Sequence, residues 1–103
     1  MEIQREEISN KKVIISLAGV IDLNNYQILK KELTDLCEKE YNEIIADFTD
    51  VKGIHNIGVS QLIVFQKKMK DKDCKLIIKN LKNENVKDKF KAMNLDKVIC
   101  IEY

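Results

Sequence analysis

The sequence predicts an α/β fold, a mixed sheet of four to five strands with three or more helices. Short runs of apolar, often β-branched residues alternate with segments whose apolar residues recur at helical spacing. No proline interrupts these segments, and no repeat or low-complexity linker divides the 103 residues. Because a chain of this length suits one domain, we expect residues 1–103 to form a single unit in the order β-β-α-β-α-β-α-β.

The first two strands are expected at residues 3–8 and 12–21, with a turn at Ser9 and Asn10 between them. A connection this short favours an antiparallel hairpin. Gly19 interrupts the second run, and a glycine inside a strand is typical of a bulge or of another backbone passing close by.

The first helix is expected over residues 25–40. Asn24 is the predicted N-cap, because Gln27 stands three residues later as in a capping box. Apolar residues then follow at helical spacing: Tyr26, Leu29, Leu33, Leu36 and Cys37.

The nearly continuous apolar run at residues 44–48 is typical of a central strand covered on both faces. Residues 49–56 predict a loop, and the helical period resumes from an N-cap at Asn56 to about Lys70.

A further strand is expected from Cys74 to Lys79, and a last one over residues 98–101. Between them a third helix is predicted, with Asn83 as its cap. One side of that helix is expected to carry its apolar residues: Val86, Phe90 and Met93. Strands joined through helices are expected to be parallel, because such crossovers are right-handed.

Composition narrows the function classes. The 18 Lys and Arg nearly balance the 17 Asp and Glu. Cys37, Cys74 and Cys100 follow no metal-binding or disulfide spacing, so we expect reduced, buried cysteines and no metal site. No glycine-rich phosphate loop is present, and we expect no cofactor. Without a signal-peptide pattern or an apolar run approaching the ~20 residues of a membrane span, the chain is expected to be cytoplasmic.

Two other functions have some support in the sequence. Ten lysines between Lys67 and Lys91 indicate a basic surface for nucleic acid, but the stretch has no arginine and Phe90 is its only aromatic residue. We therefore favour a solvated surface.

A small enzyme is the second alternative, with Asp22 and Asp47 near strand ends and His55 as the sole histidine. Carboxylates that cap neighbouring loops are favoured instead, since a short chain has little room for a desolvated pocket.

Residues 47–59 are the most informative stretch. They join a buried strand to a helix N-terminus, where free N–H groups and the helix dipole favour negative charge. Gly53 and Gly58 allow tight turning and close approach. We therefore expect a rigidly placed surface segment suited to recognising a partner.

Three blocks of the chain together resemble the STAS domain of anti-sigma-factor antagonists: residues 17–22, 44–48 and 51–62. The resemblance spans the whole chain. It implies a sheet flanked by helices mainly on one side and a domain that binds proteins and is not a catalyst. In that family a serine at the start of the second helix is phosphorylated by an anti-sigma factor that is also a kinase, and phosphorylation stops binding.

At the matching positions this sequence has His55, Asn56, Ile57 and Gly58. The family's glycine is kept, but the phospho-acceptor is replaced by Asn56, which has no hydroxyl. The resemblance therefore implies an anti-anti-sigma factor type of module, for transcription regulation, that has lost its serine switch.

The expected partner is an anti-sigma factor or a related serine kinase, with a scaffold role in a larger signalling assembly as the alternative. Ser60 and Thr49 are the nearby hydroxyls that would serve as substitute phosphorylation sites. The partner-binding residues implied by the resemblance lie around the start of the second helix: Asp22, Asn24, His55, Asn56, Gly58, Val59 and Gln61.

Overall fold

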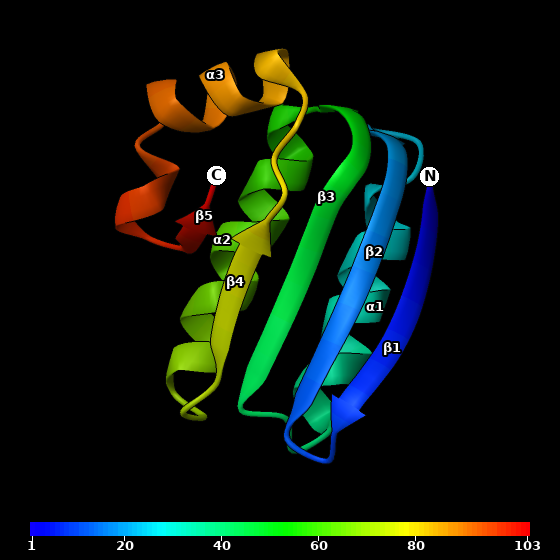
Figure 1. The fold of residues 1–103 in the computed structure, drawn as a ribbon, viewed down its shortest axis with the longest axis vertical. Coiled ribbons are helices and arrows are strands. Elements are labelled where there is room, and N and C mark those ends of the chain that lie inside the picture. The colour runs from blue at the N-terminus through cyan, green and yellow to red at the C-terminus, as the bar shows by residue number, and fades with distance from the viewer.

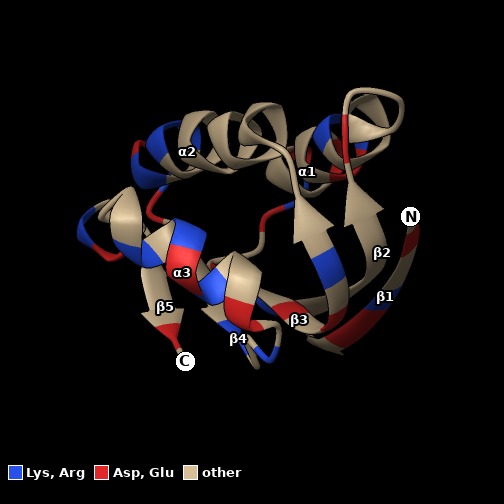
Figure 2. Ribbon diagram, turned by 90° about the horizontal axis from the view of Figure 1, so that it is seen from above, with Lys and Arg blue, Asp and Glu red and all other residues tan.

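The computed structural model describes residues 1–103 and shows a five-stranded mixed sheet with α1 and α2 packed together on one face (Figures 1 and 2). The strand order is β1-β2-β3-β4-β5, in which only β1 is antiparallel to its neighbour. The predicted fold is confirmed. The strands are β1 (Glu2–Ser9), β2 (Lys12–Ile21), β3 (Glu43–Ile54), β4 (Lys75–Lys79) and β5 (Cys100–Glu102). The helices are α1 (Tyr26–Glu38), α2 (Asn56–Lys70), α3 (Glu84–Ala92) and the 3₁₀ turn η1 (Leu95–Lys97).

The main core lies between the sheet and the two long helices. Alternate residues of β2 point into it because side chains alternate between the faces of a strand, and each buried aliphatic side chain contributes roughly 1.5–3 kcal/mol. The helices supply the opposite wall at the predicted helical spacing. Fully or nearly fully buried residues from these three elements are Val13, Ile15, Leu17, Leu29, Leu33, Leu36, Val59, Leu62, Phe65 and Met69.

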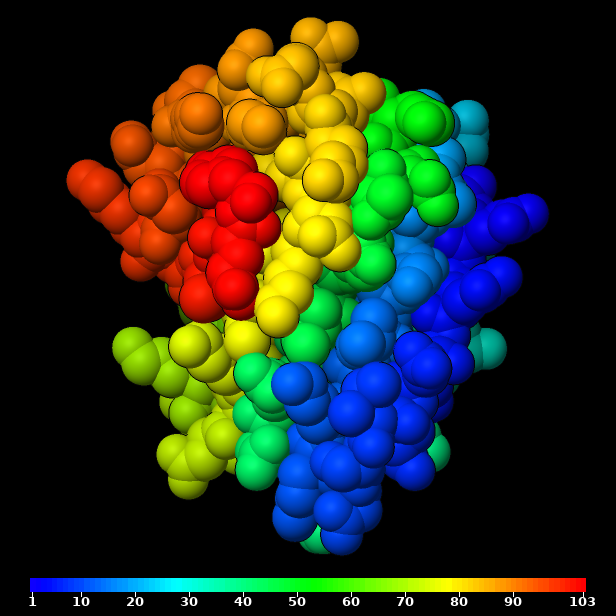
Figure 3. Space-filling model, viewed as in Figure 1, coloured from blue at the N-terminus to red at the C-terminus, as the bar shows by residue number.

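The face of the sheet that α1 and α2 leave open has its own apolar row. Ile14, Ile45, Ile77 and Cys100 are register partners across four neighbouring strands. Ile45 and Ile77 are only 5% exposed although no long helix covers them. The prediction of a central strand covered on both faces is confirmed for residues 44–48: Ile44, Ala46 and Phe48 are fully buried, and Ile45 on the other face is nearly so. The space-filling view shows this face, with the C-terminal segment beside β4 (Figure 3).

β3 is longer than predicted. Residues 49–54, expected as part of a loop, continue the strand because β2 offers them backbone partners up to the pair Ile21 and Ile54. The predicted irregularity at Gly19 is confirmed: its φ is +98°, and the β2–β3 register shifts between Gly19 and Val20. A Cβ there would stand 3.4 Å from the Met1 Cα atom.

Four smaller predictions need correction. Asn25, and not Asn24, occupies the N-cap position of α1. Met93 follows α3 and is 43% exposed, so only Val86 and Phe90 form the buried side of that helix. The last strand is Cys100–Glu102, two residues later than its predicted start, because β4 pairs with it only from that point. Of the cysteines expected to be buried, Cys74 is, but Cys37 and Cys100 are half-buried.

α3 packs against the C-terminal end of the strands. Asn83 caps it as predicted, with Oδ1 accepting from the Val86 N–H at 3.1 Å. Phe90 anchors its underside, its ring meeting that of Phe48 edge-on with centroids 5.9 Å apart. Such a pair adds about 0.5–1.5 kcal/mol to the burial of the two rings.

Candidate functional site

His55 fixes the start of α2. Its N–H donates to the Ile21 carbonyl at 2.7 Å, which extends the ladder between β2 and β3 by one residue. Its Nδ1 accepts from the Ile57 N–H at 3.1 Å, which requires the ring proton on Nε2. The prediction that Asn56 caps the helix is therefore wrong, because the bond to Ile21 holds His55 in the extended conformation that an N-cap needs.

Asn56 is the first residue of α2, and both His55 and Asn56 are exposed. The Asn56 carbonyl accepts from the Ser60 hydroxyl at 3.1 Å, so that hydroxyl is used within the helix. The first turn of α2 thus presents an imidazole and an uncharged amide at a helix N-terminus, where the backbone dipole is positive.

Gly58 and Val59 lie beneath this surface. Val59 has no exposed area, and its side chain belongs to the core. A Cβ on Gly58 would stand 2.8 Å from Ile21 Cγ2 and 3.0 Å from Ile54 Cγ1, so α2 packs closely on the ends of two strands. The expectation that Val59 contacts a partner is wrong, and Gly58 serves to seat the helix.

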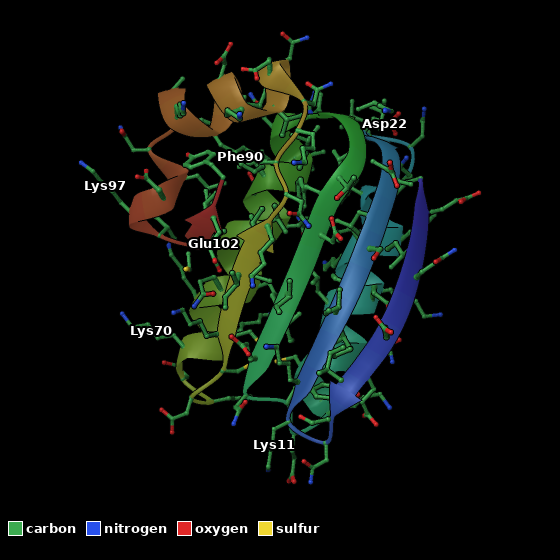
Figure 4. The ribbon with its side chains drawn as sticks, viewed as in Figure 1. Lys11, Asp22, Lys70, Phe90, Lys97 and Glu102 are labelled. Carbon is green, nitrogen blue, oxygen red and sulfur yellow. The ribbon has the colours of Figure 1, made fainter.

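Asp22 and Asn24 lie at the same end of the sheet. They follow Ile21, whose carbonyl binds His55, and Figure 4 shows Asp22 at the end of β2. Asp22 Oδ1 accepts from the Asn24 N–H at 2.9 Å, so the carboxylate shapes the turn, in agreement with the loop-capping role expected for it. Asn24 is exposed and Asp22 half-buried.

Gln61 lies one turn into α2 and is half-buried. It lines the groove between α1 and α2, together with Lys30 and Thr34 of α1. The structure therefore brings Asp22, Asn24, His55 and Asn56 to one end of the sheet, and places Gln61 on the side of α2 that faces α1.

Two further contacts hold this end in place, one from Lys89, which the sequence analysis did not single out, and one from Asn83, which it predicted only as the cap of α3. Lys89 Nζ donates to the Ile54 carbonyl at 2.6 Å, directly before His55. Asn83 Nδ2 donates to the Lys52 carbonyl at 3.1 Å. Both contacts tie α3 to the strand that leads into α2. Sequence patterns carry no signal for a lysine whose partner is a backbone carbonyl 35 residues away.

Asp47 sits in the middle of β3 and not at a strand end. Its Oδ1 accepts from the Thr49 N–H at 2.9 Å and from the Thr49 hydroxyl at 2.6 Å. Burial raises the pKa of Asp47, but hydrogen bonds from Thr49 and Asn80 and the charge of Lys82 outweigh it and lower that pKa overall. The carboxylate is thus held ionised by its structural bonds.

The constellation expected for an enzyme is not assembled. Asp47 pairs with Ser16 of β2, whereas His55 follows the pair of Ile21 and Ile54 at the far end. The intervening seven residues of strand span roughly 20 Å. Asp47 therefore cannot act on one substrate together with Asp22 and His55.

The lysines from Lys67 to Lys91 are distributed over α2, β4 and α3, with acidic residues among them (Figure 2). Lys87 pairs with Glu84 at 3.5 Å, and Lys79 with Glu102 at 3.7 Å. This mixed distribution agrees with the solvated surface that the sequence analysis favours over a nucleic-acid site. None of the helices combines the length and the hydropathy that crossing a bilayer requires.

Comparisons with known proteins identify the family. Solved structures with the same fold include the unphosphorylated anti-sigma factor antagonist SpoIIAA, at 18% identity and a TM-score of 0.82 over 99% of this chain and 89% of that one. An anti-sigma factor antagonist from Mycobacterium paratuberculosis shares 15% sequence identity with a TM-score of 0.82, over 97% of this chain and 83% of that one. A protein from Thermotoga maritima shares 21% sequence identity with a TM-score of 0.86, over 96% of this chain and 84% of that one. No curated protein sequence matches the chain. The model of the STAS domain matches residues 2–103, and the chain therefore belongs to the STAS domain family.

Proposed function

We propose that this STAS domain is a protein-binding regulatory module of the anti-anti-sigma factor type. It engages an anti-sigma factor or a related serine kinase through a docking face at the start of α2. The docking face consists of His55 and Asn56, flanked by Asp22 and Asn24, with Gln61 on the neighbouring turn. The observation that carries the proposal is an exposed amide at the first residue of α2, in a STAS fold shared with proteins described as anti-sigma factor antagonists.

The anchoring of this face supports a rigid recognition surface. Three contacts restrain the same short segment: the hydrogen bond from His55 N–H to Ile21, the close packing of Gly58 on the strand ends, and the hydrogen bond from Lys89 to Ile54. A restrained segment loses little conformational entropy when it binds, so more of the contact energy appears as affinity.

Asn56 determines how binding is regulated. A phosphate would add about −1.5 to −2 charges at this position and disrupt an interface there, but asparagine has no hydroxyl to accept it. The protein therefore remains competent to bind, and its effect on the partner follows its concentration. Ser60 and Thr49 are the nearby hydroxyls, and they donate to the Asn56 carbonyl and to Asp47.

The experiment uses purified kinase-type anti-sigma factors from the same organism and titration calorimetry. Asn56→Asp adds one charge without adding bulk, and it is expected to weaken binding by roughly tenfold, or about 1.4 kcal/mol. Stability is retained, since an acidic residue in the first turn favours the helix dipole. Asn10→Asp makes the same charge change in the exposed β1–β2 turn and serves as the matched control. Equal affinities for both variants and the wild type would refute the docking face.

A second measurement tests the lost switch. Incubation with the partner kinase and ATP is expected to leave the wild type at its original mass and to add one phosphate to Asn56→Ser. Phosphate on the wild type would instead assign the switch to Ser60 or Thr49, which Ser60→Ala and Thr49→Val would distinguish.

A scaffold role in a larger signalling assembly is the second candidate, and the absence of a hydroxyl on Asn56 also favours it. The two roles differ in outcome. An antagonist displaces a sigma factor from the anti-sigma factor in a competition assay, whereas a scaffold component joins the complex and displaces nothing.

A further inference from the structure

Two cysteines far apart in the sequence line one hollow at the end of the sheet opposite the docking face. Cys37 lies in the last turn of α1, and Cys74 directly precedes β4. Both contribute to the walls of a cavity of about 450 Å³, which Lys11 also lines. Lys11 marks this end of the molecule in Figure 4, and Asp22 marks the docking end.

Contacts of the neighbouring residues hold the two segments together. Lys72, two residues before Cys74, donates from Nζ to the Cys37 carbonyl at 3.4 Å. The Cys74 N–H donates to the Met69 carbonyl at 2.9 Å, which fixes Cys74 against the end of α2. These contacts place Cys37 and Cys74 on the walls of the same hollow in the reduced protein.

The two thiols differ in access. Cys74 is 5% exposed, and burial, together with the nearby Cys37, raises the pKa of its thiol to about 11. Cys37 is half-buried and so is open to small reagents. Because the more accessible thiol of a pair reacts first, Cys37 is the point of attack and Cys74 the resolving partner.

We propose that Cys37 and Cys74 are a modification site at which a hydroperoxide forms an intramolecular disulfide. The Cys37 sulfur attacks the peroxide oxygen, the O–O bond breaks, and the products are a sulfenic acid and water or an alcohol. The Cys74 sulfur then attacks the Cys37 sulfur, the S–O bond breaks, and a second water leaves with the thiol proton of Cys74. The peroxide is reduced, and the two thiols lose one hydrogen atom each.

This bond joins the end of α1 to the start of β4 and closes the loop that contains β3 and α2. A cross-link between distant residues restricts the unfolded chain, so the oxidised protein is expected to unfold at a higher urea concentration than the reduced one. The docking face lies at the other end of the sheet and remains free.

Cys100 provides an internal control. It is also half-buried, but it lies on the open face of the sheet opposite Ile77, separated from the hollow by the sheet itself. If the geometry of the hollow decides which thiol pairs with Cys37, the disulfide forms with Cys74. If exposure alone decides it, the disulfide forms with Cys100.

The test treats the full-length protein with hydrogen peroxide and follows it by intact mass and non-reducing peptide mapping. The expected product is a monomer lighter by two hydrogen atoms, with the Cys37 and Cys74 peptides linked, and dithiothreitol reverses it. Cys100→Ser is expected to react like the wild type, and Cys37→Ser and Cys74→Ala to lose the bond. Cys37→Ser changes only a half-buried site, so its folding is secure even if Cys74→Ala disturbs the core.

A link through Cys100, links only between chains, or sulfinic acid at Cys37 without a disulfide would each overturn the proposal. The disulfide also requires Cα atoms about 4.4–6.8 Å apart, so its formation tests the approach of the two segments directly.

Discussion

Replacing Gly58 by alanine measures how tightly α2 is seated on the sheet. The new Cβ would stand 2.8 Å from Ile21 Cγ2 and 3.0 Å from Ile54 Cγ1, well inside the ~3.5–4.0 Å of optimal carbon contact. Both isoleucines are buried, at 0% and 5% exposure, and their branched side chains have few alternative rotamers. The helix or the strand ends must therefore move.

The magnitude follows from two opposing effects. Overpacking of a buried site costs about 1–3 kcal/mol. Exchanging glycine for alanine in a helix returns about 0.5–1 kcal/mol. The difference between the two ranges is a net loss of about 0–2.5 kcal/mol for Gly58→Ala, and the central value of about 1.3 kcal/mol lowers the melting temperature of a domain this size by roughly 5–10 °C.

The assay is urea and thermal unfolding followed by circular dichroism, with Gly53→Ala as the matched control. A Cβ on Gly53 would stand 3.7 and 3.8 Å from the two methyl groups of Val20, which is ordinary contact. Gly53→Ala is therefore expected to keep the stability of the wild type or to raise it by up to about 1 kcal/mol. If Gly58→Ala is as stable as the wild type or more stable, helix propensity outweighs the packing cost. The inference that α2 packs too closely on the strand ends to admit a Cβ at Gly58 is then refuted.

Three further predictions concern the elements around the site. His55→Ala removes the acceptor for the Ile57 N–H and is expected to lose about 1 kcal/mol in urea unfolding, whereas His55→Asn, which restores a capping oxygen, should recover most of it. Phe90→Ala removes the ring that packs on Phe48 and is expected to cost about 3–5 kcal/mol, with loss of α3 protection in hydrogen exchange; a loss below about 1 kcal/mol would mean that α3 is not anchored by this ring. Because the pKa of Asp47 is lowered in the folded state, its contribution is complete above the unfolded value of 3.8 and is lost as pH falls through the lower folded value. Asp47→Asn should accordingly show a flatter decline in stability below pH 3.8, and an unchanged acid profile would contradict the assignment.

The element order could be predicted because it depends on local patterns. Helical spacing of apolar residues marked α1 and α2, and Asn83 marked the start of α3 through a bond to Val86 only three residues away. The irregularity at Gly19 was also predictable, since a glycine inside an apolar strand run favours a bulge. Interactions within about one helical turn depend on neighbouring residues and need no partner from elsewhere in the chain.

The details of the candidate site required the tertiary structure. Asn56 has the stronger intrinsic preference for an N-cap, yet His55 takes that position because the Ile21 carbonyl, contributed by β2, binds its N–H. The bond from Lys89 to the Ile54 carbonyl likewise joins residues that no periodicity relates.

What the sequence determined by itself is the set of elements, their order and the absence of a hydroxyl at the first residue of α2. The tertiary structure decided where β3 ends, which residues around Gly58 face solvent, and that Cys37 and Cys74 share one hollow while Asp47 stands apart from His55. The physical reason is the range of the interactions. Propensity and periodicity act over a few residues, whereas strand register and helix seating depend on backbone groups that meet only after the sheet has formed.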